Sequence, residues 1–214
     1  AGMDAADATD AMTSALRGFN MELSEASAQK VNDVYSELAA ISAADTQEIS
    51  TAMSKVASLA HNVNMEFETT ASFLTQGIEA TREAPETIGT ALKTIIARFA
   101  EVKSLYTKGQ LSGTDEEGET IDVNKVQTAL RSAGISMNAF LKGEEGLDRV
   151  LLRLSSRWDD LDVLTQRYIA TMASGSRQQS RFIAMMDNYA KTTEFVNSAY
   201  NSAGSGQRQF EKTL

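Results

Sequence analysis

The stretch that decides the fold runs from Pro85 to Tyr106 and reads PETIGTALKTIIARFAEVKSLY. Its large apolar residues recur at steps of three and four, the spacing of one helical face: Ile88, Leu92, Ile95, Phe99, Val102 and Tyr106. Pro85 suits the first turn of a helix, where its missing N–H costs nothing. The opposite face is expected to carry charges at Lys93, Arg98, Glu101, Lys103 and Lys108. The sequence therefore predicts a central helix, near 85–106, in an all-α domain.

Composition agrees with helices along most of the chain. The 214 residues contain one proline, whereas about 5% is usual, and they are rich in residues that favour helices. This length is enough for one sizeable core. The chain has no cysteine, which excludes a disulfide framework and thiolate metal sites.

The formal charge of −9 is modest and is spread along the chain. Phosphate binding needs clustered Lys and Arg, so nucleic acid is not expected to be a specific ligand. No apolar run approaches the ~20 residues that span a bilayer, so we expect no membrane segment. The chain begins without Met, and we expect it to be a fragment of a longer protein.

Apolar stripes of similar width precede the central helix, and short turns between them favour antiparallel helical hairpins. Gly18 is expected in a left-handed position that ends the first helix. Asp45 and Glu48 have the spacing of a capping box for a helix whose stripe runs from Ile49 to Val63.

One short segment occurs twice in this region of the chain. Asn20-Met21-Glu22-Leu23 reappears as Asn64-Met65-Glu66-Phe67, where Asn64 is expected to start the next helix. The recurrence is either chance or the trace of a hairpin repeat.

Residues 108–120, KGQLSGTDEEGET, combine three glycines and four acids and predict one exposed acidic loop. A calcium site is the alternative to this solvated loop. If Gly118 takes the invariant glycine position of an EF-hand, Gly113 and Asn124 fall on ligand positions that need a carboxylate. We therefore expect no metal and no cofactor here.

Helices are predicted again after this loop. Asp122 is expected to cap a short helix that Gly134 ends, and Ile135 to Leu141 is ambiguous between a helix and an extended segment. Further helices are expected over 147–158, 162–175 and 176–200, the last burying one face: Phe182, Met186, Tyr189, Thr193, Val196 and Tyr200.

These patterns predict a compact domain of short antiparallel hairpins around the central helix. A hairpin bundle is expected over 1–107, the acidic loop over 108–121, and a C-terminal helical region, packed on the first as one domain, over 122–203. Residues 204–214 are expected to be a tail or the start of a next segment, behind a hinge at Gly204 and Gly206.

The residues show no pattern of catalysis. His61 is the only histidine, so a triad or a two-histidine metal site would have to include it, and its place late in a helix favours a role at the helix end. Asp159, Asp160 and Asp162 could supply a carboxylate pair for acid–base chemistry, but they are expected between two helices, and Asp162 is more simply a helix cap. We expect no enzyme activity and no catalytic residue.

The segment from Gly175 to Phe182, GSRQQSRF, is more unusual. It places Arg177 and Arg181 at a helix start, where the helix dipole disfavours cations. Acidic neighbours or backbone carbonyls are therefore expected to hold these arginines, and a structural role is favoured over a binding one.

Three long motifs, in order, resemble the conserved globular region of the tape measure proteins of long-tailed phages and prophages. They are ADTQEISTAMSKVASLA at 44–60, TIGTALKTIIARF at 87–99, and RWDDL at 157–161 followed by TQRYIATMASGSRQQSRFIAMMDNY at 165–189. Ten motif positions are expected to serve structure or interaction: Gly89, Arg98, Phe99, Trp158, Gly175, Arg177, Gln178, Gln179, Arg181 and Phe182.

The resemblance implies a structural virion protein inside the tail tube, present in the host cytoplasm during assembly. It implies roles in tail assembly, length determination and genome ejection, with the tail tube protein, tail-tip or baseplate proteins and assembly chaperones as partners. Wide apolar faces also leave room for a homo-oligomer. The alternative is a cell-wall hydrolase or peptidase module attached to a tape measure protein.

One helix of this length would reach about 320 Å, whereas a globule of this size has a radius of gyration near ~17 Å. The short helices and tight turns predict the globule. We therefore expect a packed module, with tail length set mostly by other segments, or hairpins that unfold inside the tube.

Overall fold

The computed structural model describes residues 5–213, and most of them are helical. In chain order the elements are α1 (Ala5–Gly18), α2 (Glu25–Ile41), α3 (Thr46–Ser54), α4 (Ala57–Asn62), α5 (Phe67–Thr81), α6 (Pro85–Thr107), β1 (Ser112–Thr114), β2 (Thr120–Asp122), α7 (Val123–Ser132), α8 (Asn138–Lys142), α9 (Leu147–Trp158), α10 (Val163–Met186), α11 (Tyr189–Tyr200) and α12 (Ser205–Thr213). The predicted all-α class is confirmed, and the described residues add one small two-stranded sheet.

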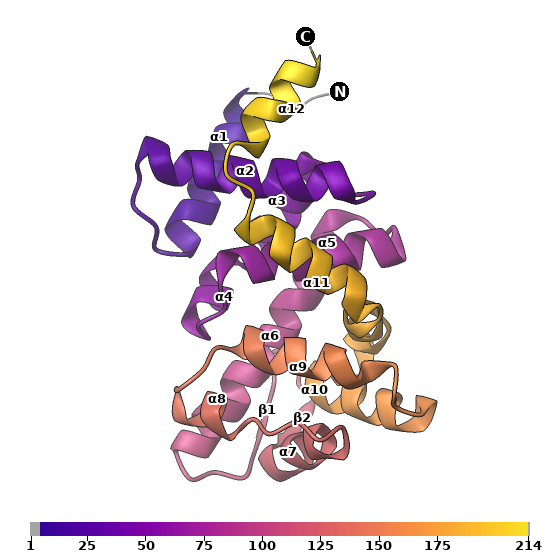
Figure 1. The fold of residues 1–214 in the computed structure, drawn as a ribbon. Coiled ribbons are helices and arrows are strands. Elements are labelled where there is room, and N and C mark those ends of the chain that lie inside the picture. The colour runs from indigo at the N-terminus through magenta and orange to yellow at the C-terminus, as the bar shows by residue number, and fades with distance from the viewer. Residues whose placement is uncertain (1–4, 214) are drawn as a thin grey trace.

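The molecule is elongated, and α6 joins its two halves (Figure 1). α6 packs against α3, α4 and α5 in one half and against α7, α8 and α10 in the other. The chain then returns, so that α11 packs on α5 and α2 and α12 packs on α2. Both ends of the described chain therefore lie at the same end of the molecule (Figure 1). Buried apolar residues from Ala15 to Ala199 form one continuous core.

α6 buries its predicted stripe, whose residues are at most 1% exposed: Ile88, Leu92, Ile95, Phe99 and Val102. Two predictions for this helix are wrong. Arg98 does not lie on an exposed face but is 3% exposed, because acceptors from other elements surround its guanidinium. Tyr106 is 43% exposed, because the last turn of α6 extends beyond its neighbours and residues 106–112 are all exposed.

α6 and α3 cross in close contact at Gly89. A Cβ added there would lie 2.5 Å from the carbonyl oxygen and 3.0 Å from the Cα of Ala52. A residue without a side chain lets the two backbones approach this closely. Gly89 therefore has a structural role in holding two motif helices together.

The repeated Asn-Met-Glu segment ends a helix at both of its sites. Asn20 and Asn64 have left-handed φ values of 52° and 55°. The N–H of each following Met donates to the carbonyl five residues earlier, at 2.8 and 2.9 Å, which is the long bond of a helix C-terminal motif. Gly18 is consequently the last residue of α1 but does not take the predicted left-handed position, which belongs to Asn20, and Asn64 does not start a helix, since α5 begins at Phe67.

Side-chain caps begin three helices where the sequence predicts them. Asp45 accepts the Glu48 N–H at 2.8 Å, and Glu48 accepts the Asp45 N–H at 2.9 Å, which completes the capping box. Asp122 accepts the Lys125 N–H at 3.0 Å. Asp162 accepts two N–H groups of the first turn of α10 at 3.0 Å each.

Two predicted helices are divided in the structure. The helix expected from Asp45 to Val63 splits into α3 and α4, although its stripe stays buried across the split. The long helix expected over 176–200 ends at Met186, and Asn188, with φ of 60° and ψ of 59°, starts α11. This break shifts the helical phase, so α11 buries Thr192, Phe195 and Ala199. Tyr189 and Tyr200, which were expected inside, are 38% and 50% exposed.

The ambiguous Ile135–Leu141 segment contains the start of the short helix α8.

Residues 108–120 are largely exposed, as predicted, but they are ordered by a hairpin. β1 and β2 pair antiparallel, with Ser112 opposite Asp122, Gly113 opposite Ile121 and Thr114 opposite Thr120. The hairpin packs against α6, where a Cβ on Gly113 would lie 3.1 Å from the Leu105 side chain.

The C-terminal residues form a docked helix. Asp33 on α2 accepts the Gly204 and Gly206 N–H groups at 2.8 and 2.9 Å. Ser205 is fully buried, and its hydroxyl donates to Glu37 at 2.6 Å. The expected hinge at Gly204 and Gly206 is therefore the start of α12, capped by a carboxylate of another helix.

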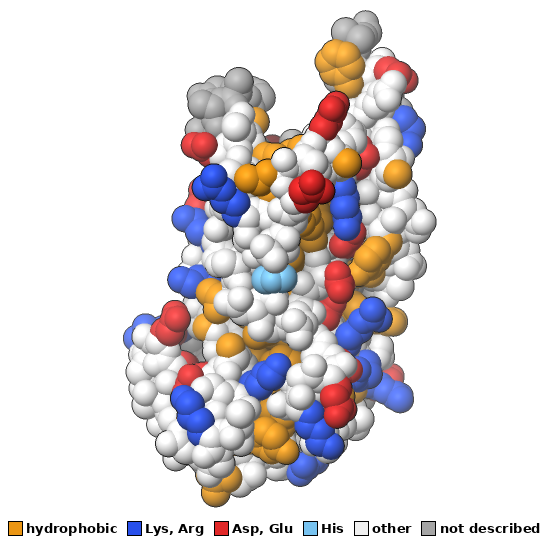
Figure 2. Space-filling model, turned by 90° about the vertical axis from the view of Figure 1, so that its left-hand side faces the viewer, with side chains coloured by type: hydrophobic (Ala, Val, Ile, Leu, Met, Phe, Trp, Pro, Cys, Tyr) orange, Lys and Arg blue, Asp and Glu red, His pale blue; other side chains and the backbone are white. Residues whose placement is uncertain are grey.

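Acidic and basic side chains are interspersed over the surface of this elongated molecule. Figure 2 shows the face that lies on the left in Figure 1, with Lys and Arg between Asp and Glu. No helix of the described residues is long and apolar enough to cross a membrane.

Candidate functional site

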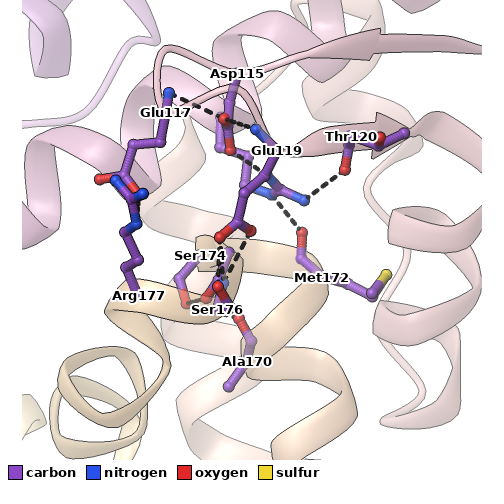
Figure 3. A network of polar contacts seen from close by, with 11 residues as sticks. Asp115, Glu117, Glu119, Thr120, Ala170, Met172, Ser174, Ser176 and Arg177 are labelled. Carbon is purple, nitrogen blue, oxygen red and sulfur yellow. Dashed lines mark hydrogen bonds and ion pairs between the residues drawn. The ribbon is translucent and has the colours of Figure 1, made fainter.

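Arg98 is the centre of a buried polar network that joins α6, α10 and the hairpin (Figure 3). Its Nε donates to the Met172 carbonyl at 2.9 Å, and its Nη2 donates to the Thr120 carbonyl at 3.1 Å. Its Nη1 forms an ion pair with Asp115, and both side chains are almost fully buried. Each nitrogen of the guanidinium thus has an acceptor, as a buried charge requires.

The network lies where α10 is broken. Gly175 has φ of 74° and ψ of 172°, outside the helical region, so the predicted stop at Gly175 is confirmed. The break leaves backbone N–H and C=O groups of α10 without partners inside the helix. The Met172 carbonyl meets Arg98, and the Ser176 N–H donates to Glu119 at 2.9 Å. Partners from outside α10 therefore satisfy both sides of the break.

Alternate acids of the hairpin turn point toward the helices. Asp115, Glu117 and Glu119 meet groups of α6 and α10, whereas Glu116 between them is exposed. The Glu117 carboxylate lies 3.8 Å from the Nε of Arg177, whose side chain is 68% exposed. Asp115 also accepts the N–H groups of Glu117 and Glu119, at 3.0 and 2.8 Å, which fixes the turn. The acidic loop is thus largely exposed, but three of its carboxylates point toward α6 and α10.

Glu119 is electrostatically the most distinctive of these acids. The hydroxyl of Ser176 donates to its carboxylate, and so does the Ser176 N–H. These two bonds, the hydroxyl first, hold the pKa of Glu119 below its ordinary value. The carboxylate therefore stays ionised at the start of the second segment of α10, where the helix dipole favours a negative charge.

Arg181 makes a second connection, between α10 and the turn that joins α5 to α6. Its Nε and Nη2 lie 2.6 and 3.0 Å from the two carboxylate oxygens of Glu83, and this pairing raises the pKa of Arg181. Gln178 accepts from Nη1 at 3.1 Å. The prediction that acidic neighbours or backbone carbonyls hold these arginines is confirmed for Arg181, whereas Arg177 is mostly exposed and has an ion pair with Glu117 at 3.8 Å.

Gln179 connects the two segments of α10 across the break. Its Nε2 donates at 3.1 Å to the carbonyl of Arg167, which precedes Gly175 in the chain. This bond helps to fix the angle between the segments.

The three aromatic motif positions are core residues. Phe99, Trp158 and Phe182 are at most 1% exposed. Phe99 meets Phe140 edge-on with ring centres 6.2 Å apart, and Trp158 meets Phe182 in the same way at 5.9 Å. The other motif positions lie in the Arg98 network, in the Arg181 connection, at the crossing of α3 and α6 (Gly89) and across the break in α10 (Gln179).

The residues considered for catalysis lie at or beside helix ends. His61 is exposed in the last turn of α4. Asp159 ends α9, and Asp162 caps α10, where bonds from Thr165 lower the pKa of Asp162. A carboxylic acid that transfers protons near neutral pH needs a raised pKa in a cleft. The described residues also contain no group of three or more potential metal ligands.

Sequence reasoning missed the partners of Arg98. These partners, Asp115, Thr120 and Met172, lie 17 to 74 positions from Arg98, and no local pattern links them to it. The one usable signal was the spacing of the acids at 115, 117 and 119, which places them on one side of an extended segment.

Comparison with known proteins gives two matches. Residues 1–175 match the model of a family described as phage-related minor tail protein. The chain is 28% identical over 214 residues to the tape measure protein of Pneumococcus phage Dp-1. That alignment covers 94% of this chain and 18% of the relative, so the chain spans less than a fifth of the relative's length. No solved structure matches significantly.

Proposed function

Since the chain belongs to the family of phage-related minor tail proteins, we propose that it is a folded module of a tape measure protein that acts in tail assembly, length determination and genome delivery. A structural role in the phage tail follows from the family and from the Dp-1 relative. The roles in tail assembly, length determination and genome delivery are proposed for the whole tape measure protein, of which this chain matches only a fraction.

The observation that carries this proposal is the continuous core. Buried apolar residues from α1 to α11 pack together, and α11 and α12 return to the first half of the chain. A single helix gains ~1.5 Å per residue, whereas this fold layers its helices side by side. The module therefore adds little length, and the ruler function belongs mostly to other segments of the parent protein.

We propose that the module works through protein–protein contacts in the tail tube interior and, during assembly, in the host cytoplasm. The partners proposed are the tail tube protein, tail-tip or baseplate proteins, assembly chaperones and further copies of the chain. Exposed apolar residues at the start of α10 offer one such contact: Val163 is 60% and Leu164 is 77% exposed. The net charge of −9 favours none of the phosphate contacts that nucleic-acid binding requires.

A deletion distinguishes a folded module from a segment that only sets tail length. In the phage or prophage that encodes this chain, removal of residues 45–106 is expected to block tail assembly or infectivity, because it takes α3 to α6 out of the core. Electron micrographs of purified particles make the measurement. Intact, proportionally shortened and infective tails would contradict the module.

A point variant makes the same test without changing chain length. Ile95→Asp places a charge at a position that is 1% exposed, and it is expected to abolish infectivity by unfolding the module. Tyr106→Asp, on the exposed end of the same helix, is the matched control and is expected to remain infective. A ruler that depends on length alone would tolerate both changes.

A further inference from the structure

The tip of the acidic hairpin, residues 112–120, is attached to the molecule mainly by polar contacts. Its sequence, SGTDEEGET, contains no aliphatic or aromatic side chain. Leu111 before it is 62% exposed, and the fully buried Ile121 after it anchors the base of the hairpin. The hydrophobic effect that holds the helices together therefore contributes little to holding the tip.

Two of the groups that receive the tip are also supported by the helices. The Nε of Arg98 donates to the Met172 carbonyl of α10 at 2.9 Å. Ser176 follows the break at Gly175, and its N–H points to the Glu119 carboxylate (Figure 3). A guanidinium and a helix N-terminus are groups that bind carboxylates. Arg98, Ser176 and Arg177 form what we call the carboxylate socket.

We propose that residues 112–120 are a strap that fills the carboxylate socket of its own chain and opens from it while the helical core stays folded. It is attached by the carboxylates of Asp115, Glu117 and Glu119 and by the carbonyl of Thr120. At one end of the strap Gly109, with φ of 68°, belongs to the C-terminal motif of α6, where the Gly109 N–H donates to the Tyr106 carbonyl at 3.1 Å, and at the other end the buried Ile121 is the anchor. The strap is a property of the fold and does not depend on the proposed role in the tail.

Salt distinguishes the strap from the core. The Debye length falls from ~10 Å at 0.1 M salt to ~3 Å at 1 M, which weakens the contacts that water can reach, Glu117 with Arg177 and Glu119 with Ser176, more than the almost fully buried pair of Arg98 and Asp115. Salt of this kind does not weaken apolar packing. Opening of the strap should therefore increase with sodium chloride under conditions that leave the core intact.

The amide of Ser176 reports this opening, because its acceptor is the Glu119 carboxylate. In hydrogen exchange followed by NMR on the whole chain, we expect its exchange to rise about tenfold between 0.05 and 1 M sodium chloride, the effect of roughly one or two lost ion pairs. The amide of the fully packed Phe99 should not change. Glu119→Gln should raise Ser176 exchange about tenfold already at low salt and reduce its response to salt.

Glu145→Gln is the matched control, since it removes the same charge from an exposed pair with Arg153. It is expected to leave Ser176 exchange unchanged. The proposal is overturned if Ser176 and Phe99 exchange in step at every salt concentration, or if both variants act equally. The salt series on the unaltered chain decides the matter by itself if Glu119→Gln does not fold.

Discussion

Among single residues, burial separates two aromatic side chains that share one predicted stripe. Phe99 is 1% exposed and contacts Phe140, whereas Tyr106 is 43% exposed. Phe99→Ala is expected to lower the free energy of unfolding by about 3–5 kcal/mol. Tyr106→Ala should cost less than about 1 kcal/mol, as surface substitutions do. Urea denaturation measures both, and a loss below about 1 kcal/mol for Phe99→Ala would mean that its ring is not packed.

Asp148 is a buried acid whose ionisation works against the fold. It is 1% exposed at the start of α9 and accepts the N–H groups of Glu66 and Arg149 at 3.3 and 2.9 Å. Burial, the largest cause, raises its pKa above the ordinary 3.8. A carboxyl whose folded pKa exceeds its unfolded value destabilises the fold above that pKa, and the penalty disappears as the pH falls through it.

The variant Asp148→Asn isolates the contribution of Asp148 to the pH dependence of stability. The free energy of unfolding of the unaltered chain, minus that of Asp148→Asn, should increase as the pH falls from about 7 to about 4. The contribution of Glu119, whose lowered pKa has the opposite sign, cancels in the difference because both proteins contain it. Denaturation at a series of pH values makes the measurement. A difference that stays constant or decreases would show that Asp148 is not protonated preferentially in the folded state.

At the scale of elements, the break in α10 depends on a glycine. Gly175 has backbone angles that other residues rarely adopt, and a Cβ there would lie 2.8 Å from the Glu119 carboxylate. Gly175→Ala should therefore cost about 1–3 kcal/mol. Gly118→Ala, at φ of 79° with no neighbour within 4 Å, carries backbone strain alone and should cost about 1 kcal/mol. Thermal unfolding compares the two, and equal losses would mean that the contact with Glu119 contributes nothing.

The elements also show what periodicity can and cannot predict. The α6 stripe and the Asp45 capping box depend on residues within a few turns, and both were predictable. The break at Asn188 was not, because apolar residues continue at helical spacing across it. Arg98 was placed on the wrong face because its partners come from the hairpin and from α10, up to 74 residues away. The motif resemblance singles out Arg98, Gly175 and Arg177. It does not predict which elements these residues contact, because those contacts depend on the tertiary fold.

At the scale of the whole molecule, the continuous core predicts one unfolding transition. Trp158, the only tryptophan, lies in the half that contains α9 and α10, so its fluorescence reports on that half. The circular dichroism of the helices reports on both halves. Tryptophan fluorescence and far-UV circular dichroism should therefore give coincident urea transitions. Two separated transitions would show that 1–107 and 122–203 are independent domains.

The position of the two chain ends has a mechanical consequence. α1 and α12 both pack on α2, at the same end of the molecule. In any longer polypeptide that contains this fold, a pull on the two flanking segments is applied at that end and not along the length of α6. A pull from the C-terminal side acts first on the contacts between α12 and α2, and then on the bonds of Asp33 to Gly204 and Gly206 at the start of α12. Tension therefore peels the module open from this end.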